Sequence, residues 1–368
     1  MRAKGNNTKI SLSATGKPID YRSAGVNIEA GNSAVDRIRP HVETTFNESV
    51  LEGIGGFGSF FDLKKLLRDY KDPVLVQSTD SVGTKISVAS MSQNFSTIGM
   101  DLVSACCNDI LVHGARPLTF LDYIATGNLK PEIIEEIVRG IAEACRHHGV
   151  ALVGGELAEM PDTYVNGEYD LVGIVTGVVE KQKIINGKNI ITGDSVLALP
   201  SNGLHTNGYS LARKLIFEVA NLTIEDRPEP LSESVSETLL APHLNYQDPI
   251  LTLLEAGHLV KGMAHITGGG IFDNIPRILP ANCGAEIFRG TWPIPPVFTL
   301  LKRLSNLPEK EMFRTFNMGL GLVMVVSPET SSEIIHCLSP ETDIFEVGTI
   351  IDADHEVRLV EAPSTKHL

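Results

Sequence analysis

The sequence predicts an α/β (α+β) protein with two domains, and three observations support this prediction. The chain has 368 residues, which is long for a single hydrophobic core. Short apolar runs of strand length alternate with helical patterns along it. A polar, glycine-containing segment at about residues 181–193 interrupts the alternation, which then starts again. We therefore expect a mobile leader over residues 1–19, an N-terminal domain over 20–181 and a C-terminal domain over 182–368.

Four strands and one helix stand out in the first half. The strands are runs rich in valine, leucine and isoleucine at residues 73–78, 118–125, 150–155 and 170–179. A helix is predicted over 132–149, because its isoleucines recur at helical spacing and it ends on Gly149, a typical C-cap residue.

The second half shows a similar mixture of elements. Strands are predicted at residues 195–200, 262–266, 321–328, 343–352 and 356–360. Helices are predicted at residues 207–220, 271–280 and 330–338. The segment 223–237 is rich in proline and glutamate, so we expect it to be an exposed excursion.

Composition and charge exclude several classes of partner. The formal net charge is −14, which argues against a nucleic-acid backbone or an anionic membrane surface as the main partner. No apolar run approaches the roughly 20 residues needed to cross a bilayer, and the N-terminal stretch is too polar for a signal peptide. The five cysteines show no CxxC or zinc-ligand spacing, which fits a reducing compartment. We expect a cytoplasmic protein.

Two similar turns precede predicted helices. His205, Thr206 and Asn207 stand directly before one helix, and the segment HITGGG, which starts at His265, stands before another. The first turn of a helix has free backbone N–H groups, so each turn is suited to an anion such as a phosphate. The alternative is that His205 has only a structural role, as the residue at which the chain enters the helix.

A glycine-rich stretch, GIGGFGSFFDL, begins at Gly53. Such a density of glycine lets backbone N–H groups approach a ligand and form an anion-binding nest, although a flexible turn is an equal alternative. The stretch matches neither a Walker A loop nor a dinucleotide-binding fingerprint in its usual setting. From the residues alone, we expect Phe57, Phe60 and Phe61 to pack in the core.

Three carboxylates are candidate ligands for Mg²⁺. Asp80 follows the first predicted strand, where open α/β sheets place ligand groups. Asp109 stands in an otherwise apolar helix, where a carboxylate needs a partner such as a metal. Glu156 follows the third predicted strand. We expect the three carboxylates to converge on one Mg²⁺ that bridges phosphates, and we expect Lys85 to contact phosphate oxygens. The alternative is that Asp80 only stabilises a turn and that Lys85 is solvated.

Asp101 has a different expected role. It stands eight residues before Asp109, which is about 12 Å along a helix axis at 1.5 Å per residue, so the two cannot easily share an ion. We expect Asp101 to be the N-cap of the helix.

Eight segments, spread in order over nearly the whole chain, resemble the successive motifs of one enzyme family. They are DYRSAGVNIEAGN, GIGGFGSFFDL, STDSVGTK, DLVSACCNDILVHGARPLTFLDYIATG, LVGGELAEMP, GLHTNGYSLARKL, HITGGG and FNMGLGLVMVV. They are similar to motifs of the phosphoribosylformylglycinamidine cyclo-ligases, also called AIR synthetases. The combination of DYxATG, GGExAEMP and GxHxNGYSL is much more specific than any glycine loop.

The resemblance implies a ligase of purine biosynthesis. ATP and formylglycinamidine ribonucleotide, a phosphoribosyl substrate, would give aminoimidazole ribonucleotide, ADP and phosphate. ATP would phosphorylate the formyl oxygen, which is otherwise a poor leaving group. A nitrogen of the amidine would then attack the same carbon, and phosphate would leave as the ring closes. The family's N-terminal, ATP-binding domain pairs its sheet across a homodimer and is followed by a C-terminal α/β domain.

The resemblance also assigns roles to individual residues. The residues matched to ATP binding are Gly55, Gly56, Phe57, Gly58, Asp80, Thr84, Lys85 and Asp109. Those matched to Mg²⁺ are Asp80, Asp109 and Glu156. Those expected to face the substrate are His205, Thr206, Asn207, Thr267, Gly268 and Gly269. The residues expected to act in catalysis are His205, Asn207 and Lys85. A segment from Ala24 to Asn27 matches a flap over ATP.

Three positions depart from the family pattern. Ser81 stands where glycine is more frequent, which makes the turn after Asp80 less open. Leu157 replaces a threonine and so removes a hydroxyl beside Glu156. Arg39 stands where some relatives have a lysine near the nucleotide.

Related families fit the sequence less well. A selenophosphate synthetase would need a reactive cysteine near its N-terminus, and this chain has no cysteine before Cys106. Formylglycinamidine ribonucleotide synthetases are much longer. Thiamine-monophosphate kinases and hydrogenase-maturation relatives lack the combination of DYxATG and HxNGYS. A non-catalytic regulator that binds a nucleotide or an anion on the same fold remains the alternative from a different class.

Overall fold

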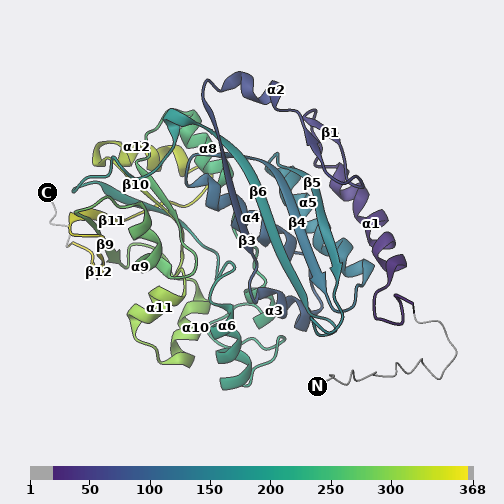
Figure 1. Ribbon diagram of the computed structural model, residues 1–368. Helices are drawn as coiled ribbons and strands as arrows, with labels where there is room; N and C mark the ends of the chain where they lie inside the picture. Colours follow the sequence, from purple (N-terminus) through teal and green to yellow (C-terminus); the bar gives the residue numbers. More distant parts are fainter. Residues whose placement is uncertain (1–19, 364–368) are drawn as a thin grey trace, which may run out of the picture.

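Two sheets, each accompanied by helices, divide the chain into two α/β domains (Figure 1). The structure is a computed structural model that describes residues 20–363, so the predicted leader over 1–19 lies outside the described residues. The N-terminal sheet has four strands and the C-terminal sheet has six. The predicted fold class is confirmed.

The four strands predicted in the first half form the N-terminal sheet. They are β3 (Pro73–Ser81), β4 (Arg116–Thr126), β5 (Ala151–Glu159) and β6 (Tyr169–Glu180). Their order in space is β3-β6-β4-β5, with β6 antiparallel to both neighbours and β4 parallel to β5. β3 and β5 run beyond their predicted ends, so Asp80 and Glu156 lie inside strands and not after them.

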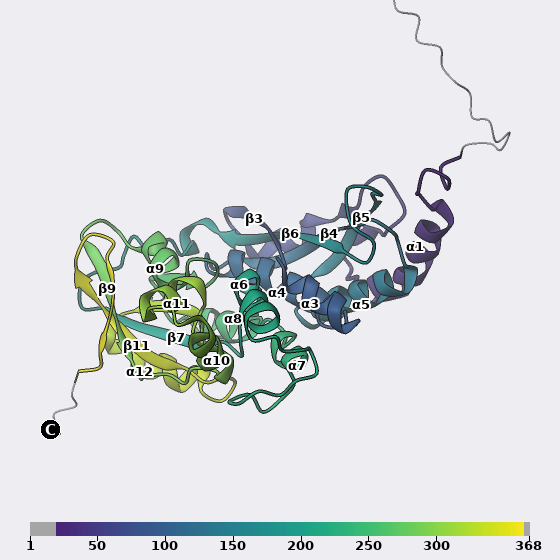
Figure 2. The same cartoon turned by 90° about the horizontal axis from the view of Figure 1, so that it is seen from below.

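Helices cover one face of this sheet. The helices of the N-terminal half are α1 (Ile28–Glu43), α2 (Leu63–Leu66), α3 (Lys85–Ser92), α4 (Ile98–Leu111) and α5 (Pro131–His147). α4 and α5 lie on the same side of the sheet (Figure 2), and α5 confirms the helix predicted over 132–149. Nearly all of α4 is buried. Its N-cap is Thr97, so the prediction that Asp101 caps this helix is wrong.

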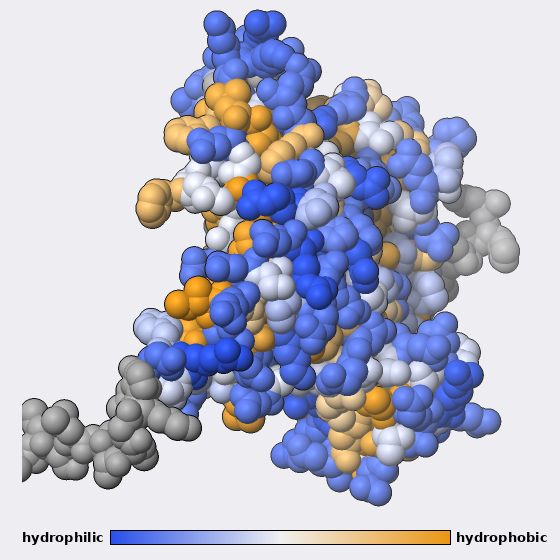
Figure 3. Space-filling view, turned by 90° about the vertical axis from the view of Figure 1, so that its right-hand side faces the viewer, coloured by the Kyte–Doolittle hydropathy of each residue, from blue (hydrophilic) through white to orange (hydrophobic). Residues whose placement is uncertain are grey.

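The opposite face of the N-terminal sheet carries exposed hydrophobic side chains. Leu75 on β3 is 57% exposed and Leu121 on β4 is 39% exposed. Phe57 and Phe60, beside the small sheet of β1 (Val50–Glu52) and β2 (Phe60–Phe61), are also exposed, so the prediction that they pack in the core is wrong. Figure 3 shows hydrophobic patches separated by hydrophilic surface on the side of the molecule that carries α1.

The C-terminal sheet contains the five strands predicted in the second half and one that was not predicted. Its strands are β7 (Ser195–Pro200), β8 (Gly262–His265), β9 (Cys283–Arg289), β10 (Leu320–Val326), β11 (Phe345–Asp352) and β12 (Val357–Glu361). They lie in the order β12-β9-β11-β7-β10-β8, and only the pair β12 and β9 is parallel. β9 is the unpredicted strand.

The helices of the C-terminal half are mostly short. They are α6 (Tyr209–Arg213), α7 (Val235–Leu239), α8 (Gln247–Glu255), α9 (Gly270–Asn274), α10 (Pro296–Ser305), α11 (Glu309–Thr315) and α12 (Pro328–Leu338). The helix predicted over 271–280 ends early, because Pro276 cannot continue the hydrogen-bond ladder and a single 3-10 turn follows. α7 begins inside the expected excursion 223–237, where Ser234 and Glu237 form a capping box.

None of the helices formed by residues 20–363 is long and apolar enough to cross a membrane.

Candidate active site

Three turns from the two domains meet beside the carboxyl end of β3. The turn after β3 reaches α6, where Thr84 Oγ1 lies 3.1 Å from Ser210 Oγ. The turn before α6 reaches the turn before α9, since a Cβ atom on Gly268 would lie 3.5 Å from Asn207 Oδ1. The structure therefore brings together three stretches that the sequence singles out separately.

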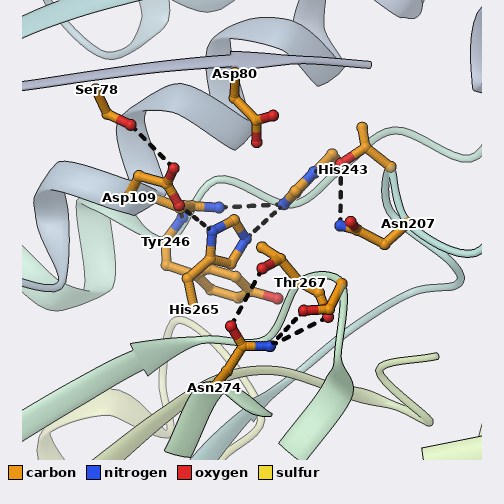
Figure 4. A network of polar contacts seen from close by, with 12 residues as sticks. Ser78, Asp80, Asp109, Asn207, His243, Tyr246, His265, Thr267 and Asn274 are labelled. Atoms are coloured by element: carbon orange, nitrogen blue, oxygen red, sulfur yellow. Dashed lines mark hydrogen bonds and ion pairs between the residues drawn. The ribbon is translucent and has the colours of Figure 1, made fainter. Parts of the chain in front are cut away.

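A buried asparagine fixes the turn before α9. Asn274 Nδ2 donates to the carbonyl oxygens of Thr267, Gly268 and Gly270 at 3.3, 3.2 and 2.8 Å (Figure 4). Gly269 has a φ of +94°, a conformation that favours glycine. The turn is thus held by its own helix, and Thr267 and Gly268 stay partly open to solvent.

The turn before α6 is strained at His205. This residue has a φ of +58°, which is unusual for a residue with a side chain, and its side chain is buried. Both ring nitrogens are buried without a hydrogen-bond partner. The surroundings are tightly packed. A Cβ atom at Gly208 would lie 2.5 Å from the Phe316 ring, and a Cβ atom at Gly321 would lie 3.0 Å from His205 Cε1. The imidazole is enclosed beneath the turn and does not reach into the open site.

A chain of polar contacts runs beneath the three turns (Figure 4). Ser78 Oγ donates to Asp109 Oδ2 at 3.1 Å, and Asp109 Oδ1 lies 2.9 Å from His265 Nδ1. The Nε2 atoms of His265 and His243 are 3.1 Å apart. His243 Nδ1 in turn lies 3.3 Å from Thr206 Oγ1.

The direction of these hydrogen bonds follows from the carboxylate at one end. A carboxylate only accepts, so His265 donates from Nδ1 to Asp109 and, when neutral, accepts at Nε2. His243 then donates from Nε2 and accepts from the Thr206 hydroxyl at Nδ1. The oxygen of Thr206 also accepts from Asn207 Nδ2 at 3.5 Å, which leaves it one further lone pair.

Burial keeps the inner imidazoles neutral. The rings of His205 and His243 are stacked, with centroids 4.1 Å apart and planes 19° from parallel. Burial lowers the pKa of His205 well below its usual 6.5, and the neighbouring His265 lowers it further. Burial and His205 lower the pKa of His243 in the same way. At neutral pH both rings are therefore uncharged hydrogen-bonding groups.

Two of the predicted metal ligands meet in the open part of the site. Asp80 and Asp109 are both half-buried, and burial followed by the negative charge of Asp109 raises the pKa of Asp80. Ser81 stabilises the turn after β3, since its N–H donates to Asp80 Oδ1 at 2.7 Å and its hydroxyl accepts from the N–H of Gly83 at 3.2 Å. Two neighbouring carboxylates form an oxygen donor set that suits Mg²⁺.

Glu156 does not join these two carboxylates within one chain, so the prediction of a single three-carboxylate site is wrong there. Ser81, Val172, Tyr123 and Glu156 form one row across the sheet, and Asp80 belongs to the neighbouring row. Adjacent residues of a strand point to opposite faces, so Asp80 and Glu156 lie on different faces. They are also three strand spacings apart, which is about 14 Å at 4.8 Å per strand.

Lys85 also differs from its predicted role. Its Nζ atom lies 2.8 Å from Asp101 Oδ2, and neither side chain is exposed. The same Nζ donates to the carbonyl oxygen of Ala241 at 2.7 Å. Because the ammonium group is fully enclosed, it does not contact a phosphate in this structure, and the predicted catalytic and ATP-binding contact of Lys85 is corrected to a structural ion pair.

The glycine-rich loop lies over a cavity of its own. A cavity of about 700 Å³ is lined by residues 53–59 and by Asp122, Tyr123 and Glu156. Arg39 holds the loop, because its Nη1 atom donates to the carbonyl oxygen of Ile54 at 2.9 Å. The predicted ATP-binding residues are therefore divided, with Gly55, Gly56, Phe57 and Gly58 here and Asp80, Thr84 and Asp109 beside the three turns.

The predicted flap is anchored to the end of β5. The N–H of Asn27 donates to Glu159 Oε2 at 2.5 Å, and the side chain of Asn27 caps α1 by accepting from the N–H of Ala30 at 3.2 Å. Glu159 Oε1 accepts from the N–H of Leu129 at 2.8 Å. The segment from Ala24 to Asn27 thus lies near β5 and not near His205.

His243 is a site residue that the sequence patterns do not indicate. It lies in the loop between α7 and α8, where no periodic pattern marks its position. One signal exists in α4, which carries buried polar residues among apolar ones. Asp101 Oδ1 accepts from the N–H of His243 at 2.7 Å, and Asn108 Oδ1 accepts from the N–H of Tyr246 at 3.0 Å. These two side chains hold the loop in place.

Family models match both halves of the chain. Residues 65–179 match the N-terminal domain of AIR synthase related proteins, and residues 192–361 match their C-terminal domain. The fold and the site thus define the class of AIR synthase related proteins.

Curated relatives narrow this class. The phosphoribosylformylglycinamidine cyclo-ligase of Geobacillus thermodenitrificans (strain NG80-2) is 49% identical over 90% of this chain and 95% of its own length. That of Alkaliphilus oremlandii (strain OhILAs) is 49% identical over 93% of this chain and 99% of its own length. The chain belongs to the phosphoribosylformylglycinamidine cyclo-ligase family.

Solved structures share the fold at much lower identity. The hydrogenase maturation protein HypE of E. coli is 20% identical, with a TM-score of 0.66 over 89% of this chain and 93% of its own. A HypE in complex with ATP is 17% identical, with a TM-score of 0.61 over 88% of both chains.

Proposed function

We propose that this chain closes the imidazole ring of phosphoribosylformylglycinamidine at the expense of ATP, as the name of its curated relatives describes. The observation that carries the proposal is the meeting of the three turns beside Asp80 and Asp109. Partly open polar groups line this place, and neutral imidazoles lie beneath it. Phosphoryl transfer followed by ring closure needs such an arrangement of fixed donors and acceptors.

The accessible residues of the turns are the proposed contacts of the substrate. Asn207, Thr267 and Gly269 are half-buried and Gly268 is exposed, so their polar groups can reach the phosphate and the formyl end of the substrate. Thr206 is 8% exposed, and its hydroxyl is oriented by His243. Its oxygen can accept a hydrogen bond from the attacking nitrogen and so help to orient that nitrogen toward the formyl carbon.

We assign His205 a positioning role. Its ring is enclosed, stacks on His243 and has no polar partner, so it acts on the substrate through the turn that it supports. The strained backbone at His205 sets the direction of Thr206 and Asn207. Asn207 remains the catalytic residue of this turn that touches the substrate.

Asp80 and Asp109 are the residues that would hold Mg²⁺. They fit this ion because both are half-buried carboxylates, and the negative charge of Asp109 adds to the effect of burial in raising the pKa of Asp80. When bound, Mg²⁺ would neutralise charge on the phosphates of ATP. Ser78 and His265 orient the carboxylate of Asp109 through one hydrogen bond to each of its oxygens.

The glycine-rich loop is the proposed contact of a nucleotide at the β5 edge of the N-terminal sheet. Asp80 lies on β3 at the opposite edge, so the phosphates of this nucleotide would meet the Asp80 and Asp109 of a second copy. The backbone groups of the loop line the cavity of about 700 Å³, and the neighbouring Phe57 is fully exposed. A related fold, HypE, has been solved with ATP, which supports a nucleotide on this architecture.

A homodimer would cover the open face of the N-terminal sheet. Leu75 and Leu121 are exposed on this face in a single chain, and burying such residues stabilises an interface. A second copy would also bring its own Glu156 near the interface. We also propose a cytoplasmic location, because all five cysteines are free and four of them are buried.

A coupled assay tests the function. The protein is incubated with ATP, Mg²⁺ and formylglycinamidine ribonucleotide, and aminoimidazole ribonucleotide and ADP are measured together. Equal amounts of both products are expected. ADP without the imidazole would mean that another acceptor is the natural one. Binding of ATP without turnover would favour a regulator built on the same fold.

A further inference from the structure

A second cluster of histidines lies where the end of α5 meets the start of α8. His147 is the last residue of α5, and His148 follows as its C-cap. Asp248 lies in the first turn of α8. One nitrogen of each imidazole and an oxygen of the carboxylate all lie within 4.8 Å of one another.

The distances within this cluster are somewhat longer than those between the ligands of a bound metal ion. His147 Nε2 lies 3.5 Å from Asp248 Oδ2, and His148 Nδ1 lies 3.5 Å from Asp248 Oδ1. Two ligands of a tetrahedral zinc ion with bonds of about 2.0–2.1 Å are about 3.3 Å apart. The three ligand atoms lie within 4.8 Å of one another and would close toward this separation around an ion.

His148 is the buried member of the cluster. Its side chain is 9% exposed, and its Nδ1 atom is buried without a hydrogen bond, although Asp248 is close. A buried lone pair without a donor is unfavourable, and a metal ion would satisfy it.

The backbone around the cluster is fixed by another buried side chain. Gln247 is 3% exposed, and its Nε2 atom donates to the carbonyl oxygen of His148 at 2.6 Å. This bond ties the end of α5 to the start of α8. The ligands are thus held on two helices from different parts of the chain, and His147 and Asp248 remain open to incoming ions.

We propose that His147, His148 and Asp248 form a binding site for a late first-row divalent metal ion, of which Zn²⁺ is the probe. Two imidazoles and one carboxylate suit zinc and its neighbours in the series, whereas Mg²⁺ prefers oxygen ligands alone. Three protein ligands leave a fourth position for water. The bound ion joins the end of α5 to the start of α8 and so stabilises the contact between these helices.

Zinc titration of the full-length, metal-stripped protein tests this proposal. A chromogenic chelator competes for Zn²⁺, and an excess of Mg²⁺ occupies sites made of carboxylates alone. The variants are H147A and D248N, whose side chains are 70% and 55% exposed, so both should fold normally. Each should weaken zinc binding at this site by more than about tenfold, since even outer-sphere changes cost about 10–100-fold. The melting temperature of the parent should rise with Zn²⁺, and this rise should be smaller in both variants.

A matched control and a second histidine cluster sharpen the test. H41A removes a histidine that lies 3.6 Å from a single carboxylate, Glu135, and it should bind Zn²⁺ like the parent. His205, His243 and His265 are also within 4.8 Å of one another, so zinc uptake at this second cluster has to be separated from the proposed site. H243A should therefore leave the proposed site intact. Equal stoichiometry and affinity in the parent, H147A and D248N would overturn the proposal, as would zinc uptake that only H243A abolishes.

Discussion

Lys85 Nζ lies 2.8 Å from Asp101 Oδ2, and this ion pair is completely buried. Lys85 begins α3 and Asp101 lies in α4, so the pair joins two helices of the N-terminal domain. The other oxygen of Asp101 accepts from the N–H of His243, a residue of the C-terminal half. One buried carboxylate thus links the lysine of the STDSVGTK motif to the imidazoles beneath the active site.

Replacing Lys85 with methionine should strongly destabilise the protein. The substitution leaves Asp101 buried without its cation, and breaking a buried pair costs about 3–5 kcal/mol. Urea unfolding measures this loss. K65M removes one partner of an exposed ion pair with Glu48 and should change the free energy of unfolding very little. If K85M unfolds like the parent but no longer uses ATP, Lys85 contacts the phosphate after all.

Replacing His205 with asparagine should lower turnover by at least about 100-fold while leaving the fold intact. Asparagine tolerates a positive φ, but it cannot stack on His243. H355N is the control, because His355 also has a positive φ, of 53°, and lies outside the proposed site.

The pH profile of H205N distinguishes a positioning residue from a proton acceptor. A positioning role leaves the pH dependence of the residual activity unchanged. Loss of the acidic limb in H205N would instead mean that His205 itself takes up the proton. Wild-type turnover in the variant would remove His205 from the site altogether.

Stability should fall as the pH drops below about 6.5. His205 and His243 have folded-state pKa values below 6.5, so the unfolded chain binds protons that the folded chain does not. Each residue should contribute a slope of up to about 1.4 kcal/mol per pH unit. Urea unfolding between about pH 7 and pH 5 measures this slope, which should be shallower in H205N. A slope that is the same in H205N and the parent would mean that His205 is protonated in the folded state.

Most of the fold could be predicted because buried strands appear as apolar runs. β7 and β10 are such runs, and α5 shows a clear helical period. β9 was missed because Glu286 and Arg289 interrupt its apolar residues. α1 was missed because polar residues separate its few apolar ones, such as Ala34, Ile38 and Val42, and Pro40 lies inside it.

The site could be predicted only in part. Asp80 and Asp109 could be predicted from local signals, because Asp80 stands near the end of a strand and Asp109 stands in an otherwise apolar helix. The fold then brings the two residues into one site. The place of Glu156 depends on the order of strands and on which face each residue takes, and a shift of one residue reverses the face. His243 was missed because its loop is held by long-range bonds, from the N–H of His243 to Asp101 and from the N–H of Tyr246 to Asn108.

Leu121→Arg should convert the proposed homodimer to a monomer. The substitution puts a charge on the open face of the N-terminal sheet, where Leu121 is 39% exposed in the single chain. Size-exclusion chromatography with light scattering measures the mass. L259R is the control, because Leu259 is 80% exposed and lies between α8 and β8. A monomeric parent, or a dimeric L121R, would contradict the proposed interface.

Asp80→Asn and Asp109→Asn should each raise the Mg²⁺ concentration required for half-maximal turnover of ATP, and their effects should not add. Both carboxylates face the same place, so loss of either one removes the paired donor set. Glu156→Gln should act independently of Asp80→Asn, with a coupling below about 0.5 kcal/mol, because the two side chains lie on different faces of the sheet. The Mg²⁺ dependence of the single and double variants measures both couplings. Strong coupling between Asp80 and Glu156 would contradict this separation and would mean that the Glu156 side chain of a second copy completes the metal site.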